Sequence, residues 1–503
     1  MTRPSVWEDR NPRTPAPAAE VEGAVDVVVI GGGLTGLTTA LLLGRAGRRV
    51  VVLEADRVGA GTTGRSTAKV SLLQGTRLSQ ISSKHPVSVV RDYVDGNREA
   101  QAWVERFCEE HGVGLQHRAA YTYAHGGRGE RQVRQEHEAA QRAGLATEWV
   151  DELGLPYPTR GAVRLADQVQ LDPLELVHAL AREAEGHGVS VVEGTRALEV
   201  SGSGPYRVVT EQGSVAAGTV VVATNMPMLD RGGFFARMKP ARSYGLTFRT
   251  PEPPIDGMYL SADQPSRSLR DVPDGPDGPL LMVGGNGHPT GRGGSTEQRL
   301  DELRAWTAEH WPGAVETHAW SAQDFMPHHE LPFAGPLVPG NDHLLMAGGY
   351  SKWGMTNAVA ASLALSGRVL GGHLEWADAW RTWRPREVRG LAKAAMVNAE
   401  VGWHLTQGWV KPLLPGRTAP EEGEGVVHGE GVLRRPVAVS RTGGQERTVS
   451  AVCTHLGGIV AWNDAERSWD CPLHGSRFDA DGSVLDAPAT CGLKRATVVE
   501  EAR

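Results

Sequence analysis

The sequence predicts an α/β protein that carries a separate small domain at its C-terminal end. First, residues 25–56 read as strand, glycine-rich turn, helix and strand, which is the order of a βαβ unit. Second, residues 189–285 contain short apolar runs bounded by turn residues, which indicate more strands, the later ones in a second, mixed sheet. Third, three of the four cysteines lie from residue 453 onward, after a stretch rich in Pro, Gly and Glu. With 503 residues, the chain is long enough for two or more domains.

The first turn carries a glycine pattern that suits a dinucleotide. Gly31, Gly33 and Gly36 fit G-x-G-x-x-G between an apolar strand and an apolar helix. The first glycine permits the tight turn, the second lets a pyrophosphate approach the backbone, and the third lets helix and strand pack closely. Glu54 ends the next strand, where it can accept hydrogen bonds from ribose hydroxyls, and its charge disfavours the 2′-phosphate of NADP. The predicted cofactor contacts in this unit are Gly31, Gly33, Leu34, Thr35, Gly36, Glu54 and Ala55.

A second glycine-rich loop follows at residues 59–69, which read Gly-Ala-Gly-Thr-Thr-Gly-Arg-Ser-Thr-Ala-Lys. One interpretation is an ordinary surface loop. The other is a loop whose backbone and hydroxyl groups line the cofactor. This second interpretation predicts cofactor contacts from Thr63, Ser66, Thr67, Ala68 and Lys69.

The middle of the chain alternates helix and strand. Residues 88–112 predict a helix, because apolar residues recur at helical spacing, and Cys108 on it is predicted to be packed. Residues 173–187 predict a second helix. Short strands are predicted at 189–192, 196–200, 206–211 and 219–223, and strands of the second sheet at 238–249 and 280–285. The fourth of these strands ends in small and polar residues, so Ala223 and Thr224 are predicted to contact the cofactor.

Another strand, glycine turn and helix are predicted within residues 343–372. The turn has no nucleotide fingerprint, but the N-terminus of its helix could face a partial negative charge on a bound cofactor. The predicted contacts here are Gly349, Lys352, Trp353, Gly354, Met355 and Thr356. Further on, residues 380–414 predict an amphipathic helix and residues 414–425 a linker.

These elements predict four parts. They are a flexible tail at residues 1–24, a nucleotide-binding domain with an inserted substrate subdomain at 25–378, a helical segment and linker at 379–420, and a terminal domain at 421–503. The tail is rich in Pro, Ala and Arg and lacks the apolar centre of a signal peptide.

The composition excludes several classes of partner. The net charge of −7 is spread along the chain, so no nucleic-acid surface is predicted. No apolar run is long enough to span a bilayer. We therefore expect a cytoplasmic protein without nucleic-acid or membrane partners, and the sequence gives no indication of its oligomeric state.

The C-terminal domain contains a pair of Cys/His motifs. Cys453-Thr-His455 is followed, after fifteen residues, by Cys471-Pro-Leu-His474. Two thiolates and two imidazoles on glycine-turn loops could bind a tetrahedral zinc ion. They also fit a Rieske [2Fe–2S] centre, in which two His replace two Cys on one iron. Cys491 lies outside this ligand spacing and is predicted to be a packed thiol.

The sequence motifs around these residues closely resemble those of the Rieske family: Cys-Thr-His-Leu-Gly-Gly and Cys-Pro-x-His-Gly-Ser-x-Phe. Ala487-Pro-Ala489 resembles the proline loop of that family. The resemblance implies a small all-β domain with a [2Fe–2S] cluster. It implies that Gly458 and Leu473 stand where respiratory-complex members have a disulfide. It also implies that Ser476 hydrogen-bonds a cluster sulfur, and that Phe478 replaces a Tyr whose hydroxyl often does the same. Because hydrogen bonds to sulfur raise the potential, an intermediate potential is expected.

Three segments resemble the superfamily of FAD enzymes that contains D-amino-acid oxidase, glycine oxidase and sarcosine oxidase, at residues 25–69, 168–225 and 320–370. The motifs that carry this resemblance are the glycine fingerprint, Gln170-Leu-Asp172-Pro173, the strand end at 221–225 and the turn at 348–356. The resemblance implies a glutathione-reductase-like fold, with FAD extended across a Rossmann-like domain and a mixed sheet over the isoalloxazine. It implies hydride removal from the carbon next to an amine nitrogen, followed by hydrolysis of the imine.

Five residues around the expected flavin face are candidates for the catalytic site: Arg242, Tyr244, His288, Trp320 and Lys352. Arg242 could pair with a substrate carboxylate in bidentate fashion, or be a solvated strand residue. His288 could lie over the ring or be an inert loop histidine, and Lys352 could lie near the flavin or extend toward solvent. No cysteine falls where the family attaches flavin covalently, so dissociable FAD is expected.

The two expected cofactors suggest an internal relay, because a flavin takes two electrons as hydride and a [2Fe–2S] centre passes one at a time. The leading hypothesis is FAD-dependent oxidation of a C–N bond in a small amine or N-substituted amino acid, with O2 or a redox protein as the electron acceptor. An alternative is an NAD(P)H-linked reductase that feeds an oxygenase, although the sequence has no second G-x-G-x-x-G. A third is a non-catalytic redox sensor.

Overall fold

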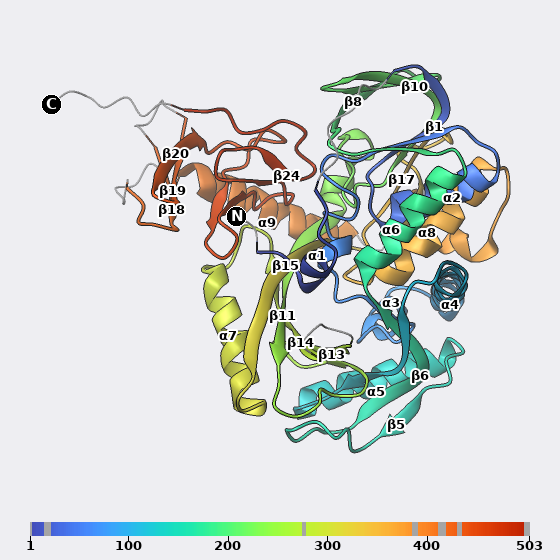
Figure 1. Cartoon of the computed structure of the whole chain (residues 1–503), viewed down its shortest axis with the longest axis vertical. Helices are drawn as coiled ribbons and strands as arrows, with labels where there is room; N and C mark the ends of the chain where they lie inside the picture. Colours follow the sequence, from blue (N-terminus) through green and yellow to red (C-terminus); the bar gives the residue numbers. More distant parts are fainter. Residues whose placement is uncertain are drawn as a thin grey trace.

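The computed structural model describes residues 3–14, 22–273, 278–384, 391–410, 419–429 and 435–496, with residues 391–397 described as backbone only. In these residues the chain forms two large sheets and a smaller all-β unit that is attached through a long helix, α9 (Figure 1).

The first sheet contains the predicted nucleotide-binding unit. Within the described residues it has eight strands, of which β16, β17, β10, β1, β2 and β7 lie side by side in that order. The strands are β1 (Ala24–Ile30), β2 (Val50–Leu53), β7 (Ser190–Val192), β8 (Ala197–Ser201), β9 (Tyr206–Thr210), β10 (Gly213–Val222), β16 (Phe333–Pro336) and β17 (Leu344–Gly348). Its centre is parallel, and alternate residues of β1 pack into two different cores, Val27 and Val29 into one, Val28 and Ile30 into the other. Burial on both faces explains the continuous apolar run of this strand.

The second sheet is mostly antiparallel. Its order is β15, β11, β14, β13, β12, β4, β6 and β3, with β5 paired to β6. The longest pairing joins β11 to β15, and Figure 1 shows these two strands reaching up to the all-β unit. The strands are β3 (Lys69–Val70), β4 (Leu115–Tyr123), β5 (Glu148–Val150), β6 (Ala162–Leu171), β11 (Met238–Arg249), β12 (Met258–Ser261), β13 (Arg267–Val272), β14 (Leu280–Pro289) and β15 (Val315–Pro327).

The helices cover the sheets and connect their strands. Helices α2, α6 and α8 pack side by side on the first sheet, and α4 packs against α8. The helices of this part are α2 (Leu34–Arg45), α3 (Arg77–Ser82), α4 (Val87–His111), α5 (Gly127–Arg142), α6 (Pro173–Gly186), α7 (Thr296–His310) and α8 (Gly354–Val369), with short 3-10 turns η1 (Thr63–Arg65), η2 (Arg231–Ala236) and η3 (Glu375–Trp380). Cys108 on α4 is buried, as predicted. None of the helices in the described ranges combines the length and apolar character needed to cross a membrane.

The C-terminal unit has two small antiparallel sheets in its described residues. They comprise β18 (Gly425–His428), β19 (Val437–Thr442) and β20 (Gln445–Ser450), and β21 (Ala461–Asn463), β22 (Ser468–Asp470), β23 (Arg477–Phe478) and β24 (Val484–Asp486). These short paired strands enclose a core of their own, which includes Trp469 and Phe478.

Helix α9 (Leu391–Val410) connects the two parts of the molecule, and the helix predicted over residues 380–414 is only partly correct. Residues 381–384 are not helical, and residues 385–390 and 411–418 lie outside the described residues, as does the start of the predicted linker. Glu400 on α9 pairs with Arg292 Nη1 at 2.7 Å and with Lys239 Nζ at 3.2 Å. Trp409 Nε1 donates to the carbonyl of Gly457 in the terminal unit at 3.2 Å, so side chains of α9 contact both parts.

The described start of the chain is packed, which corrects the prediction of a flexible tail for this segment. Helix α1 (Val6–Arg10) begins with a capping box formed by Ser5 and Glu8. Trp7 is 1% exposed, and its Nε1 donates to the carbonyl of Ser66 at 2.8 Å. Composition did not indicate this helix, because a five-residue helix around one tryptophan leaves no periodic pattern.

We expect Trp7→Ala to lower the free energy of unfolding by about 3 kcal/mol, since it removes a buried aromatic ring and leaves a cavity. Thermal unfolding of the purified protein measures this change. The control is Trp403→Ala, because Trp403 is 61% exposed. Equal melting temperatures for the two variants would contradict a packed α1.

Candidate functional site

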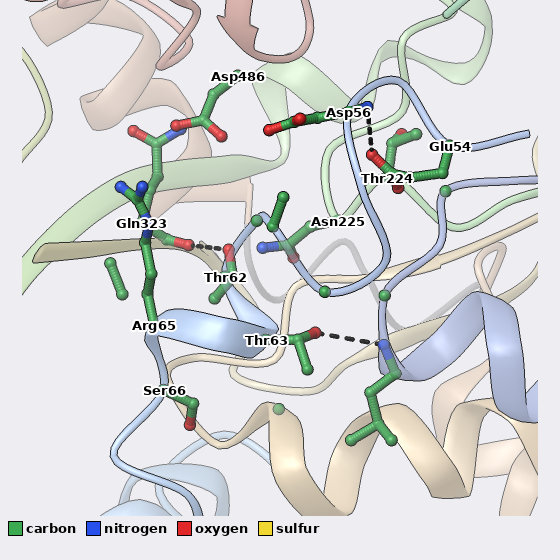
Figure 2. A pocket seen from close by; sticks show the side chains of 18 of the residues that line it. Glu54, Asp56, Thr62, Thr63, Arg65, Ser66, Thr224, Asn225, Gln323 and Asp486 are labelled. Carbon is green, nitrogen blue, oxygen red and sulfur yellow. Dashed lines mark hydrogen bonds between the residues drawn. The ribbon is translucent and has the colours of Figure 1, made fainter. Parts of the chain in front are cut away.

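A cavity of 830 Å³ opens beyond the C-terminal ends of β1, β2 and β10. Its walls come from the first sheet, from β11 and β15 of the second sheet, from the N-terminal segment and from the C-terminal unit. Figure 2 shows side chains from several of these elements turned toward the same space. Open α/β sheets bind their ligands in this position, and the volume suits a large organic cofactor with its substrate.

The glycine turn after β1 forms the narrow part of this cavity. Gly31 has φ +112°, and a Cβ there would lie 2.7 Å from the carbonyl oxygen of Ala223. A Cβ on Gly36 would lie 1.9 Å from the carbonyl oxygen of Gly31, so Gly36 does not line the cavity but lets α2 pack against the turn. Gly33 is the N-cap of α2 and has no side chain to cap it, so the helix N-terminus opens toward the cavity. Such an N-terminus attracts a pyrophosphate. The residues of this unit that line the cavity are Gly31, Gly33, Leu34, Thr35, Glu54 and Ala55.

Glu54 is held at the cavity wall by backbone N–H groups. Its Oε2 accepts from Gly32 N at 2.6 Å, and its Oε1 accepts from Asp56 N at 2.9 Å. Burial raises the pKa of this carboxyl, and the two N–H donors oppose that shift. A carboxylate has further lone pairs, so Glu54 can still accept from ribose hydroxyls.

The loop at residues 59–69 divides into a cavity-lining part and a buried part. Thr63, Ser66 and Thr67 line the cavity, and Thr63 Oγ1 accepts from Leu34 N at 3.2 Å, as Figure 2 shows. Ala68 is buried outside the cavity. Lys69 is buried there too, with its Nζ donating to Tyr259 O at 2.9 Å and to Ser268 Oγ at 2.8 Å. The described loop is therefore not an ordinary surface loop.

The second glycine turn brings the N-terminus of α8 to the same cavity as that of α2. Lys352, Gly354 and Met355 line the cavity, as do Ala223 and Thr224 after β10. The other three predicted contacts lie behind the wall. Gly349 packs on Pro327, Trp353 is the half-buried N-cap of α8, and Thr356 Oγ1 accepts from Gln74 Nε2 at 3.0 Å.

Lys352 lines the cavity, and its side chain is exposed there rather than packed in a core. Its Nζ is so close to the sheet that a Cβ on Gly287 would lie 2.5 Å from it. Burial lowers the pKa of Lys352, and the nearby carboxylate of Asp324 opposes this shift. Asp324 also accepts from Lys352 N and, at 3.0 Å, from Asn225 Nδ2, so it joins this turn to the end of β10.

Tyr244 and Trp320 line the cavity, whereas His288 lies behind Tyr244. His288 Nδ1 lies 2.9 Å from Pro289 O and 3.0 Å from Arg292 O, so Nδ1 donates and Nε2 accepts from the Tyr244 hydroxyl at 2.9 Å. Burial lowers the pKa of His288 to about 4, which keeps the ring neutral at physiological pH. These contacts make His288 a support for Tyr244.

Arg242 is not a solvated strand residue, which corrects one of the two interpretations of it. Its side chain is 1% exposed, and Nη2 donates to Ser321 and to Glu466 of the C-terminal unit. Its Nε and Nη1 are buried and have no hydrogen-bond partner among the described residues, although Nη1 lies 3.9 Å from Asp486 Oδ2, and Arg242 is one of the residues that line the cavity. A carboxylate in the cavity could accept from these remaining donors.

The four predicted metal ligands lie on two loops with matching hydrogen bonds. In the first, Cys453 N donates to Gly458 O at 2.8 Å and Gly457 N donates to Cys453 O at 3.1 Å. The second repeats the pattern, with Cys471 N to Ser476 O at 2.8 Å and Gly475 N to Cys471 O at 3.2 Å. The loops face each other, with the ring centroids of His455 and His474 5.1 Å apart.

Hydrogen-bond donors surround the two sulfurs. The pKa of Cys453 is lowered first by a hydrogen bond from Cys471 and then by the N–H groups of His455 and Leu456. The N–H groups of Leu473 and His474 point at Cys471 in the same way. Backbone donors of this kind stabilise the charge of a thiolate-bound cluster.

The imidazoles complete a donor set that fits a Rieske cluster. Nδ1 of His474 is buried and has no hydrogen-bond partner within the described residues. No three His, Cys, Asp or Glu side chains of the described chain come together around one metal ion. A Rieske centre needs no such group, because each of its two irons takes two protein ligands, whereas structural zinc takes four.

Two neighbours of the cluster site bear on the sequence predictions. Cys491 is exposed, so its prediction as a packed thiol is wrong; it belongs to a surface loop after the proline loop. Ser476 Oγ accepts from Ala489 N at 3.0 Å and also reaches Cys453, so it connects the proline loop to a ligand sulfur.

Several residues of the site were not predicted, because their partners are far away in the sequence. Gln323 and Asp324 lie on β15, and Glu466 lies before β22, where no motif marks them. The same holds for Asp230 and Phe235, which contact the two predicted ligand histidines from the N-cap and the body of η2. These unpredicted residues are Asp230, Phe235, Gln323, Asp324 and Glu466.

We expect Gly36→Ala to lose the dinucleotide cofactor while the C-terminal cluster stays, because the new Cβ would push α2 away from the turn. Absorbance and cofactor extraction measure this loss. Gly186→Ala is the matched control, since a Cβ at Gly186 has no neighbour within 4 Å. Full cofactor content in Gly36→Ala would contradict the role of this close approach.

Comparisons with known proteins agree with this geometry. The family model of FAD dependent oxidoreductases matches residues 26–368, and the Rieske [2Fe-2S] domain model matches residues 417–497. A relative from Bacillus subtilis (strain 168), described as the Rieske 2Fe-2S iron-sulfur protein YhfW, is 33% identical to this chain over 498 residues. The match covers 97% of this chain and 96% of that protein.

Solved structures show the same fold for the larger part of the chain. Glycine oxidase from Geobacillus kaustophilus superposes with a TM-score of 0.60 at 18% identity, covering 72% of this chain and 99% of that one. L-proline dehydrogenase from P. horikoshii superposes with a TM-score of 0.59 at 19% identity, covering 73% and 96%. The chain belongs to the FAD-dependent oxidoreductases of the D-amino-acid oxidase type, with FAD as cofactor and a C-terminal Rieske domain that carries a [2Fe–2S] cluster.

Proposed function

We propose that this protein oxidises a C–N bond in an amine or N-substituted amino acid and passes the electrons to its Rieske cluster. When bound, FAD supplies a hydride acceptor next to the substrate carbon. The oxidised substrate, an imine, then hydrolyses to a carbonyl compound and an amine.

The observation that carries this proposal is that both domains form one cavity. The wall includes the cofactor loops of the FAD domain and, from the Rieske domain, Arg477, Asp486, Ala487, Ala489 and Thr490. The second cluster loop ends directly before Arg477, so the cluster site adjoins the cavity wall. Such proximity favours transfer between the two cofactors over two separate functions.

Lys352 is the best-placed group to take the proton from a substrate ammonium. Lys352 lines the cavity, and its pKa is lowered from the usual 10.5. Its amine is therefore more often neutral than that of a fully hydrated lysine at the same pH, and a neutral amine can accept a proton. Tyr244 and Trp320 form the adjoining wall, and Trp320 is fixed there because its Nε1 donates to Arg65 O at 2.9 Å. Apolar rings at this wall exclude water from the reacting carbon.

The neighbours in fold support an amine substrate. The names of two of them, glycine oxidase and L-proline dehydrogenase, refer to a primary and a secondary amino acid. Arg242 also lines the cavity, and its Nε and Nη1, which have no hydrogen-bond partner within the described part of the chain, are donors that suit a carboxylate. An amino acid or its N-substituted form therefore fits the cavity chemistry better than a nicotinamide dinucleotide.

The proposal is tested by mixing the holoprotein anaerobically with a panel of amines and N-substituted amino acids, and separately with NADH and NADPH. We expect at least one amine to bleach the flavin absorbance. Bleaching by NADH or NADPH alone would instead favour the reductase that feeds an oxygenase. Bleaching by neither would favour the redox sensor.

The rate of flavin reduction should depend on pH through Lys352. Because its folded pKa is lowered, the lysine becomes neutral, and able to accept a proton, as pH rises through a value below 10.5. Stopped-flow measurement should show the rate rising with pH, and Lys352→Met should remove this rise and lower the rate about 10²–10⁴-fold. Lys239→Met removes a lysine on β11 that does not line the cavity, and it should keep the rise. An unchanged pH profile in Lys352→Met would refute the assignment.

His455→Ala should abolish the cluster while FAD stays bound and reducible by substrate. The reason is that the cluster site is built from the loops at Cys453 and Cys471, whereas the predicted pyrophosphate site is the separate glycine turn at Gly31. Iron and acid-labile sulfide assays, EPR and anaerobic bleaching measure these outcomes. Loss of substrate-driven FAD reduction in a folded variant would contradict the proposed order, with FAD first and the cluster second.

A further inference from the structure

His455 and His474 form one side of the cluster site, the histidine edge, and residues of the FAD domain cover it. Asp230 Oδ1 lies 2.5 Å from His455 Nε2. The Phe235 ring meets both imidazoles edge-on, with centroids 5.7 Å from His455 and 5.1 Å from His474. Both histidine side chains are about 5% exposed. The edge therefore faces a fixed partner inside the same chain.

Gln323 joins the FAD cavity to the second cluster loop. It lies on β15, is 5% exposed and lines the cavity. Its carbonyl accepts from Thr62 Oγ1 at 2.6 Å, a contact drawn in Figure 2, and its Oε1 accepts from Thr290 Oγ1 at 2.7 Å. Its Nε2 donates to Gly475 O at 2.8 Å. Because the Gly475 carbonyl can only accept, Nε2 must face it, and this contact fixes the orientation of the side-chain amide.

Gly475 permits this contact. It has φ +82°, and a Cβ there would lie 2.6 Å from Pro240 Cβ and 3.1 Å from Gln323 Nε2. Gly475 follows the ligand His474 directly, so one hydrogen bond and one peptide unit separate the cavity wall from a cluster ligand.

We infer that Gln323 is a positioning residue that fixes the second cluster loop against the FAD cavity, so that FAD reduces the cluster in place and the Rieske domain need not move. This inference rests on the proposed relay between the two cofactors. Other contacts dock the domain independently. Arg242 pairs with Glu466, and Ser295 Oγ donates to Asp464 at 2.6 Å. Within the second cluster loop, Arg292 Nε donates to Pro472 O at 2.8 Å, next to Cys471, whereas the Gln323 contact holds the side of His474. Loss of the Gln323 contact should thus loosen the His474 side of the loop without releasing the domain.

The electrons balance with one outside reactant. Reduced FAD gives up two electrons and two protons when it returns to FAD, and the cluster holds one electron at a time. In turnover, an outside one-electron acceptor of the ferricyanide kind must therefore oxidise the cluster twice for each FAD regenerated; the test omits this acceptor, so that the reduced cluster accumulates. The protons pass to water.

The test uses three variants of the holoprotein. Gln323→Met removes the amide at similar volume. Thr290→Val removes the hydroxyl that holds Gln323 Oε1. Ser295→Ala, the control, removes an interdomain hydrogen bond at the Asp464 contact. FAD is photoreduced anaerobically with EDTA as the electron donor, which makes the result independent of any substrate, and samples frozen at intervals report the reduced cluster by EPR.

We expect Gln323→Met to slow cluster reduction about tenfold or more, as a misplacement of about 1 Å does at well-positioned sites. Thr290→Val should slow it less, and Ser295→Ala should keep the wild-type rate. FAD content, iron content and the g-values of the cluster should stay unchanged in all three. If Gln323→Met does not fold, Thr290→Val decides the question.

Wild-type rates in Gln323→Met and Thr290→Val would overturn the inference, and so would equal slowing in Ser295→Ala. A failed substrate proposal gives a different result. In that case no amine would bleach the FAD, while photoreduced FAD would still reduce the cluster at a rate that depends on Gln323.

Discussion

A buried ion pair fixes the Rieske domain on the FAD domain. Arg242 on β11 pairs with Glu466, and Arg477 Nη2 reaches the same carboxylate at 2.6 Å, with all three side chains at most 3% exposed. Removing one partner from a buried pair typically costs about 3–5 kcal/mol, because the other charge stays buried alone. The position of β11 in the second sheet is therefore tied to the position of the Rieske strands, and both border the cavity.

This arrangement gives the Rieske domain two tasks at one place. Its proline loop closes part of the cavity, with the flanking Asp486 and Thr490 also among the lining residues. Its ligand loops lie directly behind this wall, with their histidine edge on Asp230 and Phe235. In the proposed function, substrate selection and electron transfer therefore depend on the same interdomain contact.

The sequence allowed the local features to be predicted and left the distant ones open. Gly31, Gly33 and Gly36 follow from spacing alone, because a tight turn and close helix packing need glycines at fixed intervals. The predicted ligands Cys453, His455, Cys471 and His474 follow from a short motif in the same way. The partner of Arg242 is 224 residues away, and that of Gln323 is 152 away, so no local pattern indicates either contact. The packed Trp7 was missed for the same reason, since its partner Ser66 lies in another loop.

The central claim is that the two cofactors of this chain exchange electrons across one fixed interface. The most direct measurement is an anaerobic titration with an amine that bleaches the flavin, in which absorbance and EPR are recorded on the same samples. The account predicts that the EPR signal of the reduced Rieske cluster grows as the flavin absorbance falls, without any added mediator. A fully bleached flavin beside a cluster that stays oxidised, although dithionite can reduce it, would contradict the account.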